Sequence, residues 1–291
     1  MTRESVAREG APMVGRTRLV NDLHALGVRP GAVLMVHARI SALGWVVGGT
    51  GTVVLALLDA LGPDGTLMAY AGWEDDPYDM ARWPAAWRAA YEADLPPFYS
   101  RTAEAVHAHG RLPERIRTWP GAFRSRHPEA GVAAVGARAA WITVDHPWDD
   151  AYGAGSPLAK LVEAEGQVLL LGAPLATLTL LHHAEATARV AEKRRVTYRM
   201  PLLEDDRAVW REFHDIDTAE GAFPYEEVAG EIAATPGIGS EPDPFAAIAL
   251  QALAAGIGHQ DRIGAAESTL FPAAELHRFA HTWLEDRFGR G

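Results

Sequence analysis

Residues able to transfer a proton occur at helical spacing in one segment of the sequence, 177–191. His182 and Glu185 are three residues apart and Arg189 follows four residues later, so all three share one face of the helix predicted for this segment. A histidine titrates near pH 6.5 when unperturbed and can act as a general base towards a reacting group. The neighbouring His183 points about 100° away, so at most one of the two histidines faces a given cleft.

Two other interpretations fit the same segment. His182 could be an ordinary packed histidine, with Glu185 and Arg189 forming a surface ion pair, which the spacing alone favours because such pairs are common. A metal site made of His182, His183 and Glu185 fits the pattern less well, because adjacent histidines diverge and no further ligand stands at a characteristic spacing. We therefore predict no metal site.

Strands and helices predicted from hydrophobic patterning must position these side chains. An apolar run at 168–171 ends at Gly172, shortly before the helix with His182, and ligands of α/β sheets bind at the carboxyl ends of strands. A unit of amphipathic helix, glycine turn and short apolar run occurs three times, which predicts an α/β fold whose strands are buried on both faces. The predicted helices cover 19–26, 52–61, 158–164 and 273–287, and the strands cover 32–37, 66–70, 168–171, 194–198 and 209–214.

The composition of the 291 residues indicates one folded chain. With 48% hydrophobic and 22% charged residues, the chain can bury a sizeable core. No convincing linker divides it, so we predict a mobile lead-in over 1–15 and a single domain over 16–291. The sequence contains no run of about 18 apolar residues, the length needed to span a membrane. The N-terminus also lacks the apolar core of a signal peptide, so we expect a cytoplasmic protein.

The sequence lacks several features on which common protein classes depend. It contains no cysteine, which excludes disulfides, thiolate metal sites and an acyl-cysteine intermediate. No P-loop, dinucleotide-binding glycine pattern or serine-hydrolase elbow is present. The formal net charge of −11 disfavours nucleic acid as a partner, whereas it would draw a cationic substrate to an acidic cleft.

Four blocks of the sequence resemble one known family, in the same order. The segment VLLLGAPLATLTLLHHAEATA at 168–188 resembles the LLLGAP…T.LHYAE signature of the aminoglycoside 3-N-acetyltransferase (Antibiotic_NAT) family. The resemblance implies the Antibiotic_NAT-like fold, a layered mixed sheet flanked by helices, and not the GNAT fold. The sequence departs most from the family at 74–122 and 218–262, which implies inserted segments that shape the substrate pocket. The other matching blocks are 23–54, 123–136 and 269–289.

The resemblance implies transfer of the acetyl group of acetyl-CoA to the 3-amino group of a 2-deoxystreptamine aminoglycoside, which confers resistance. In this family the histidine of the LH-x-AE block is the general base, which is His182 in this sequence. Asp215 is the implied acidic partner of this base, Glu185 on its own helix face is the competing one, and Asp217 is assigned to antibiotic contact. The missing cysteine fits direct transfer within a ternary complex.

The resemblance also implies where the two substrates bind. Glu74, Asp75 and Asp76 follow the strand at 66–70 and would contact a cationic antibiotic through charge-assisted hydrogen bonds. Backbone N–H groups and side chains of two other blocks would bind acetyl-CoA and its phosphates. This second set consists of His37, Ala38, Arg39, Ile40, Ser41, Gly48, Gly49, Arg124, Ser125 and His127.

Two other functions are compatible with the sequence. One is an acetyltransferase of the same fold that acts on a biosynthetic amine, and the other is a non-catalytic aminoglycoside-binding protein. His182 and the acidic residues near Asp215 argue against the binding protein, which needs no base. The sequence determines neither the antibiotics accepted nor whether the protein is a monomer or a homodimer.

Overall fold

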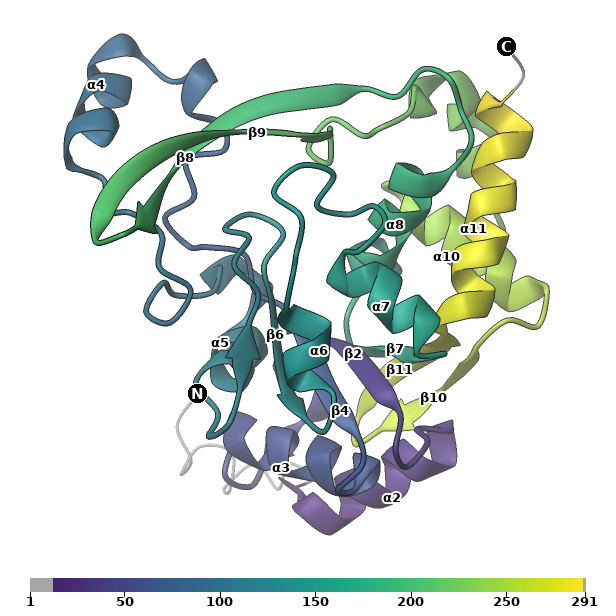
Figure 1. The fold of residues 1–291 in the computed structure, drawn as a ribbon. Helices are drawn as coiled ribbons and strands as arrows, with labels where there is room; N and C mark the ends of the chain where they lie inside the picture. Colours follow the sequence, from purple (N-terminus) through teal and green to yellow (C-terminus); the bar gives the residue numbers. More distant parts are fainter. Residues whose placement is uncertain (1–12, 290–291) are drawn as a thin grey trace.

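A seven-stranded mixed sheet forms the centre of the computed structural model, which describes residues 13–289 (Figure 1). The strands are β2 (Val33–Ala38), β4 (Thr66–Tyr70), β5 (Phe123–Arg124), β6 (Val132–Gly136), β7 (Gln167–Leu171), β10 (His259–Ile263) and β11 (Ala266–Pro272). Their order across the sheet is β10-β11-β7-β2-β4-β6-β5. β2 pairs in parallel with both β4 and β7, and the other neighbours pair antiparallel.

Helices cover both faces of this sheet, because alternate residues of its central strands enter two separate cores. Leu34 and Val36 of β2 belong to one core, whereas Val33 and Met35 belong to the other. This arrangement confirms the layered mixed sheet and the strands buried on both faces. The first core packs under α2 (Arg16–Leu26), α3 (Thr50–Leu61) and α5 (Arg111–Arg117), and the second under α6 (Ala139–Thr143), α7 (Pro157–Glu163), α8 (Leu180–Thr187), α10 (Pro244–Ala254) and α11 (Ala273–Phe288). In the described part of the chain, no helix is both long and apolar enough to cross a bilayer.

Short polar and glycine signals set the ends of several helices. Ser156 begins α7 by accepting a hydrogen bond from the Ala159 N–H at 3.0 Å, and Asp243 begins α10 through the Ala246 N–H at 2.8 Å. α2 ends at Gly27, whose φ of 105° lies in the left-handed region. These local signals agree with the helix ends that the core packing requires.

The helix that carries His182 is shorter than the one predicted within 177–191. A single 3-10 turn, η4 (Leu175–Thr177), follows β7, and α8 covers only eight residues before the backbone becomes extended at Ala188. Two turns of helix are nevertheless enough to place side chains three residues apart on one face.

The N-terminal boundary of the fold differs from the predicted one. Of the lead-in expected over 1–15, residues 1–12 lie outside the described part of the chain. Residues 13 and 14 form β1 (Met13–Val14), which pairs in parallel with β3 (Trp45–Val46). The fold therefore begins before residue 16.

A two-stranded antiparallel ribbon lies apart from the main sheet and crosses the top of Figure 1. It consists of β8 (Arg195–Glu204) and β9 (Arg207–Ile216), and its buried side chains pack with Trp73 and Phe98 in a third, smaller core. Helix α4 (Ala85–Asp94) lies at the far end of the ribbon and buries no residue. The divergent segment 74–122 therefore supports the ribbon as well as the sheet.

The second divergent segment, 218–262, is largely part of the fold itself. It contains the 3-10 turn η5 (Tyr225–Val228), the short helix α9 (Ala229–Ala233), α10 and β10. α10 packs in the second core and β10 forms one edge of the sheet. Only part of this segment is therefore available to shape a pocket.

Three histidines pack between α8 and α11. The His183 and His277 rings stack with their centroids 4.5 Å apart, and the His281 ring lies 5.7 Å from that of His277. Burial lowers the pKa of His183, and burial together with the two neighbouring histidines lowers the pKa of His277 to about 4. The packing of these helices therefore favours neutral imidazole rings at His183 and His277.

We expect the protein to lose stability as the pH falls from 6.5 towards 4. An unfolded histidine titrates near 6.5, so below that pH the unfolded chain binds protons that the stacked rings exclude. Because His277 is partly exposed, its neutral form should account for about 1 kcal/mol between pH 7 and pH 5, close to the value of one pKa unit. Calorimetric unfolding of the parent and of His277→Gln at both pH values measures this difference. The control is His259→Gln, because His259 is exposed on β10 and this variant should lose as much stability between pH 7 and pH 5 as the parent. If His277→Gln also lost as much stability as the parent, the proposed role of the histidine stack would be contradicted.

Candidate active site

A cavity of about 910 Å³ lies where the parallel strands of the sheet end. Its wall includes the end of β2 and the loop that follows, Tyr70 at the end of β4, and residues between β7 and α8. The N-terminus of α3, the loop before α5 and the start of α5 also line the cavity. The edge of the sheet predicted to hold a ligand therefore carries a cavity of suitable size for one.

His182 lies on α8 and forms part of the cavity wall. Its ring packs against Tyr152 and Phe245, with centroid distances of 5.2 and 4.8 Å. Its Nδ1 atom lies 2.7 Å from Oε2 of Glu185, three residues later on the same helix face. Because an ionised carboxylate only accepts hydrogen bonds, Nδ1 carries the proton and the lone pair of the neutral ring is on Nε2. The ring can therefore accept a proton at Nε2.

Glu185 is 1% exposed and is held through both of its oxygens. The Tyr225 hydroxyl donates a hydrogen bond to Oε1 at 2.7 Å, while Oε2 contacts His182. Burial and the adjacent Glu185 raise the pKa of Tyr225, so the phenol keeps its proton and remains a donor. The spacing alone favours a surface ion pair between Glu185 and Arg189. Among the described contacts, however, the buried Glu185 carboxylate contacts His182 and Tyr225 and not Arg189. Tyr225, Glu185 and His182 thus form a hydrogen-bonded chain that fixes the orientation of the imidazole.

Asp215 occupies a different place from the one assigned to it as the acidic partner of His182. Its carboxylate is 2% exposed and accepts hydrogen bonds from the Ala151 N–H at 2.9 Å and the Ile216 N–H at 2.8 Å. Burial raises the pKa of Asp215 to about 6. At the end of β9, this carboxylate ties the ribbon to the loop that carries Tyr152, and Glu185 is the carboxylate that contacts the imidazole.

Glu129 is a cavity residue that the sequence analysis did not select. It is 9% exposed, and the Tyr152 hydroxyl donates to its Oε1 and Oε2 at 2.8 and 3.1 Å. The Tyr70 hydroxyl lies 3.4 Å from Oε1 and donates more closely to the Glu129 carbonyl, at 2.7 Å. Burial raises the pKa of Glu129 to about 8, and the negative charge of Asp76 adds to this effect. One signal was present in the sequence, because Glu129 is the single acidic residue of the block 123–136.

Comparison with known proteins identifies the family. The family model described as aminoglycoside 3-N-acetyltransferase matches residues 35–285. The chain belongs to this family. It is 52% identical over 288 residues to the aminoglycoside N(3)-acetyltransferase VIII of Streptomyces fradiae, a match that covers 99% of this chain and 97% of that protein. It is 47% identical to the aminoglycoside N(3)-acetyltransferase IX of Micromonospora chalcea over the full length of both chains.

Solved structures of aminoglycoside acetyltransferases have the same fold. The crystal structure of AAC(3)-Xa superposes with a TM-score of 0.90 at 49% identity and covers 99% of this chain and 98% of that one. AAC-IIIb in a binary complex with CoASH superposes with a TM-score of 0.85 at 43% identity, covering 96% and 99% of the two chains. AAC-VIa bound to sisomicin superposes with a TM-score of 0.84 at 37% identity, covering 95% and 100%.

Most residues that the family resemblance assigns to acetyl-CoA lie in the cavity wall of this acetyltransferase. His37, Ala38, Arg39, Ile40, Ser41 and Gly49 are part of the wall, whereas Gly48 is adjacent to it. Thr50, the first residue of the 12-residue helix α3, is also in the wall, so the positive end of a helix dipole points to the cavity. Arg111, which the sequence analysis did not select, adds a second cationic side chain.

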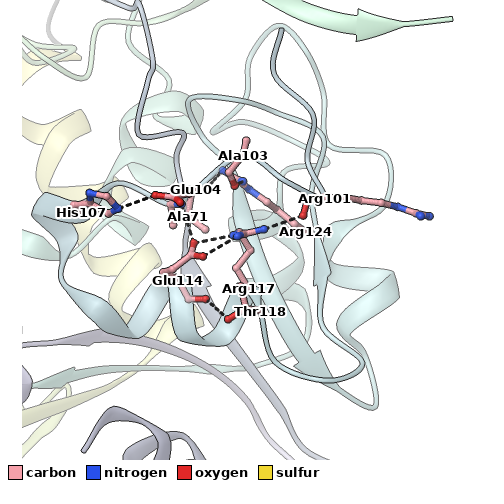
Figure 2. A network of polar contacts seen from close by, with 10 residues as sticks. Ala71, Arg101, Ala103, Glu104, His107, Glu114, Arg117, Thr118 and Arg124 are labelled. Atoms are coloured by element: carbon pink, nitrogen blue, oxygen red, sulfur yellow. Dashed lines mark hydrogen bonds and ion pairs between the residues drawn. The ribbon is translucent and has the colours of Figure 1, made fainter. Parts of the chain in front are cut away.

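The remaining three members of that set lie outside the cavity wall and stabilise loops around it. Arg124 donates hydrogen bonds to the carbonyls of Ala71 and Ala103 (Figure 2). Ser125 is fully buried, and its Oγ lies 3.0 Å from both the Val132 N–H and Nδ1 of His146.

His127 is the third of these loop-stabilising residues and is also fully buried. Its Nδ1 accepts from the Ala130 N–H at 2.9 Å and its Nε2 lies 3.2 Å from the Trp148 carbonyl. Burial keeps the pKa of His127 well below its ordinary value, so the ring is neutral. Such a ring carries no charge for a phosphate, and its contacts instead fix the loop that contains Glu129.

The acidic run expected to contact the antibiotic separates into three environments. Glu74 accepts from the His107 N–H at 2.6 Å, and Asp75 is exposed to solvent. Asp76 accepts from the Tyr78 N–H at 2.7 Å, and burial raises the pKa of Asp76 to about 7. Among the three, Asp76 is therefore the one electrostatically coupled to the Glu129 carboxyl in the cavity wall.

Asp217 lies at the end of the ribbon and is partly exposed. Its Oδ1 accepts hydrogen bonds from the N–H groups of Ala219 and Glu220 at 3.0 and 2.9 Å. These bonds shape the turn after Thr218, and Thr218 itself is part of the cavity wall.

In residues 13–289, no group of three or more histidine, aspartate or glutamate side chains is arranged to hold a metal ion.

We expect Asp215→Ala to lower the free energy of unfolding by about 1–3 kcal/mol, because it leaves two buried backbone N–H groups without their acceptor. Asp217→Ala should cost less, since the N–H groups it releases can bond to water. Urea unfolding at pH 7 measures both changes. Equal effects of the two substitutions would show that the Asp215 carboxylate does not anchor the ribbon to the 149–152 loop.

Proposed function

We propose that the protein transfers the acetyl group of acetyl-CoA to the 3-amino group of a 2-deoxystreptamine aminoglycoside. The observation that carries this proposal is the chain of hydrogen bonds from Tyr225 through Glu185 to His182, which ends at a large cavity. The family, the relatives named as aminoglycoside N(3)-acetyltransferases and the neighbour bound to CoASH all support it. The resulting amide can no longer be protonated, so acetylation removes a positive charge from the antibiotic and would confer resistance.

His182 acts as the general base in this proposal. As the neutral amine attacks the thioester carbonyl carbon, a C–N bond forms and Nε2 takes the proton that the amine loses. The tetrahedral adduct then breaks its C–S bond, and the imidazolium returns the proton to the sulfur of the departing CoA. Glu185 stabilises the imidazolium while Tyr225 holds Glu185 in place. The sequence contains no cysteine that could carry the acetyl group, which fits direct transfer between the two substrates.

Acetyl-CoA would bind along the loop after β2 and at the N-terminus of α3. The backbone at Gly49 and Thr50 lies at the start of this helix, where N–H groups and the helix dipole favour phosphate. Arg39 and Arg111 in the same cavity wall would add charge-assisted hydrogen bonds to it. This proposed site keeps the residues of the first sequence block that matches the family. It omits Arg124, Ser125 and His127, which lie outside the cavity wall, and includes Arg111, which lies in it.

The antibiotic would bind against the acidic part of the cavity wall, near Glu129 and His182. A neighbour at 37% identity was solved with sisomicin bound, which supports an aminoglycoside at this site. The net charge of −11 favours approach of a polycation, and this attraction weakens as salt is added.

We expect His182→Gln to lower kcat by about 10²–10⁴ while the KM for acetyl-CoA changes by less than about threefold, since only the proton acceptor is lost. Release of CoA, detected with a thiol reagent and a panel of aminoglycosides, measures this without background from protein cysteine. The control is His214→Gln, because His214 is an exposed residue of the ribbon. Full activity of His182→Gln would refute the general base, and a parent enzyme that acetylates only other amines would refute the substrate.

Glu185→Gln tests which carboxylate supports the base. Removing the negative charge beside Nδ1 destabilises the imidazolium, so the acid limb of the kcat/KM profile should move to lower pH and kcat should fall about tenfold or more. Asp215→Asn should leave that limb in place, because its carboxylate contacts backbone N–H groups. A shift of the limb in Asp215→Asn and none in Glu185→Gln would reverse the assignment.

A further inference from the structure

We propose that three buried histidines outside the cavity wall are positioning residues for the acetyl transfer. Their ring N–H groups hold the loop that carries Tyr152, and the Tyr152 ring packs against that of His182. The three residues are His127, His146 and His183. The inference rests on the proposed function and extends the set of residues that orient its general base.

The loop 144–156 joins α6 to α7 and contains neither helix nor strand. Its middle is nevertheless buried, since Ala151 is 1% exposed and Tyr152 is 3% exposed. Asp145 and Asp150 adopt left-handed backbone conformations with φ of 52° and 61°, which are uncommon for residues other than glycine. A buried backbone without strand partners needs other donors for its carbonyl groups. The conformation of this loop therefore depends on the groups packed around it.

Two consecutive residues of α8 contact Tyr152, one at its backbone and one at its ring. Nδ1 of His183 donates a hydrogen bond to the Tyr152 carbonyl at 2.7 Å, because a carbonyl oxygen can only accept. The centroid of the His182 ring lies 5.2 Å from that of Tyr152 and 4.8 Å from that of Phe245. The bond from His183 thus sets where the Tyr152 ring stands, and this ring limits rotation of the catalytic imidazole.

The other two histidines hold the loop just before Tyr152. Nε2 of His146 donates to the Ala151 carbonyl at 2.8 Å. Nε2 of His127 donates to the Trp148 carbonyl at 3.2 Å, from the segment between β5 and β6. Together with the bond from α8, these contacts tie the loop to two separate elements of the fold.

Burial keeps the three rings neutral, because it lowers the pKa of His183, lowers that of His146 to about 4 and keeps that of His127 well below its ordinary value. A neutral imidazole has one N–H donor and one acceptor nitrogen. In His127 this acceptor, Nδ1, receives the Ala130 N–H at 2.9 Å. In His146 it lies 3.0 Å from the Ser125 hydroxyl. The rings therefore hold the loop without adding positive charge beside the catalytic base.

Two substitutions of His183 separate positioning from packing. In His183→Asn the amide nitrogen comes close to the place of Nδ1 and keeps the hydrogen bond, whereas His183→Leu fills the space without a donor. We expect His183→Leu to lower kcat by about tenfold to a hundredfold and His183→Asn by less than about threefold, since a slightly misplaced base is costly. The thiol assay for released CoA measures both. The KM for acetyl-CoA should change by less than about threefold, because the residues proposed to bind it lie on other elements.

A purely structural role predicts the opposite order. The site of His183 is buried, so an apolar leucine would be tolerated better there than a polar asparagine. Urea unfolding of the two variants measures their stabilities alongside kcat. If kcat followed stability, or if both variants lost kcat equally, the inference would be overturned.

His146 gives an independent pair, and His277 gives the control. His146→Gln keeps a donor near Nε2 and should retain more of the parent's kcat than His146→Leu, while equal kcat in these two variants would count against the inference. The His277 ring stacks on His183 at 4.5 Å, but its Nε2 contacts Thr187 and not the loop. We therefore expect His277→Gln to keep kcat within about threefold of the parent at pH 7. A loss in His277→Gln as large as that in His183→Leu would assign the effect to helix packing and overturn the inference.

Hydrogen exchange tests the loop without relying on activity. The Asp150 N–H bonds to the His214 carbonyl, and the Ala151 N–H bonds to the Asp215 carboxylate. Both amides should exchange about tenfold or more faster in His183→Leu than in the parent, because loss of the donor favours local opening, whereas the variant that keeps the donor should match the parent. A parent enzyme that acetylates no aminoglycoside would overturn the proposed function and the role in acetyl transfer with it. An active parent in which His183→Leu keeps both the exchange rates and the kcat would overturn only the inference.

Discussion

The central strands β2, β4 and β7 are buried on both faces, and this constraint determines where chemistry can occur. Their side chains alternate between two apolar cores, so polar groups within them would be left without water or partners. The polar side chains of the cavity therefore lie at the carboxyl ends of these strands and in the loops beyond them. The cavity lies at this edge, where backbone and side-chain groups of several loops converge.

Burial of carboxyl groups is the second feature of the site, and each one is stabilised differently. Glu185 is buried between a phenol and an imidazole, each of which contacts one of its oxygens. Asp215 accepts two backbone N–H groups and so replaces the water it has lost. Glu129 has two phenols near it and the negative charge of Asp76, so it retains a proton instead. Three buried acidic residues thus have three sets of partners: an imidazole and a phenol, two backbone N–H groups, and two phenols in the cavity wall.

The sequence predicted those features that depend on local spacing. Apolar runs located the central strands, and the interval of three residues placed Glu185 beside His182. The contact from Tyr225 escaped this reasoning because it joins residues 40 positions apart. Ser125 and His127 were assigned to the cofactor because they lie in a sequence block that matches the family. Polar residues next to an apolar run can equally form hydrogen bonds with buried backbone groups, and Ser125 and His127 do so. Glu129 was overlooked because one acidic residue in an apolar block has no spacing to distinguish it.

The ribbon is attached to the loop that carries Tyr152 in the cavity wall. Asp149, Asp150 and Ala151 all hydrogen-bond to the end of β9, and the next residue is Tyr152. The residues proposed to bind acetyl-CoA, in contrast, lie at the end of β2, in the loop and 3-10 turn that follow it, and at the first residues of α3 and α5. We therefore expect substitutions in β8 and β9 to change the cavity wall near Tyr152 more than the residues proposed to bind acetyl-CoA. Among relatives of this enzyme, such a division would let the range of drugs inactivated diversify while the acetylating machinery stays the same.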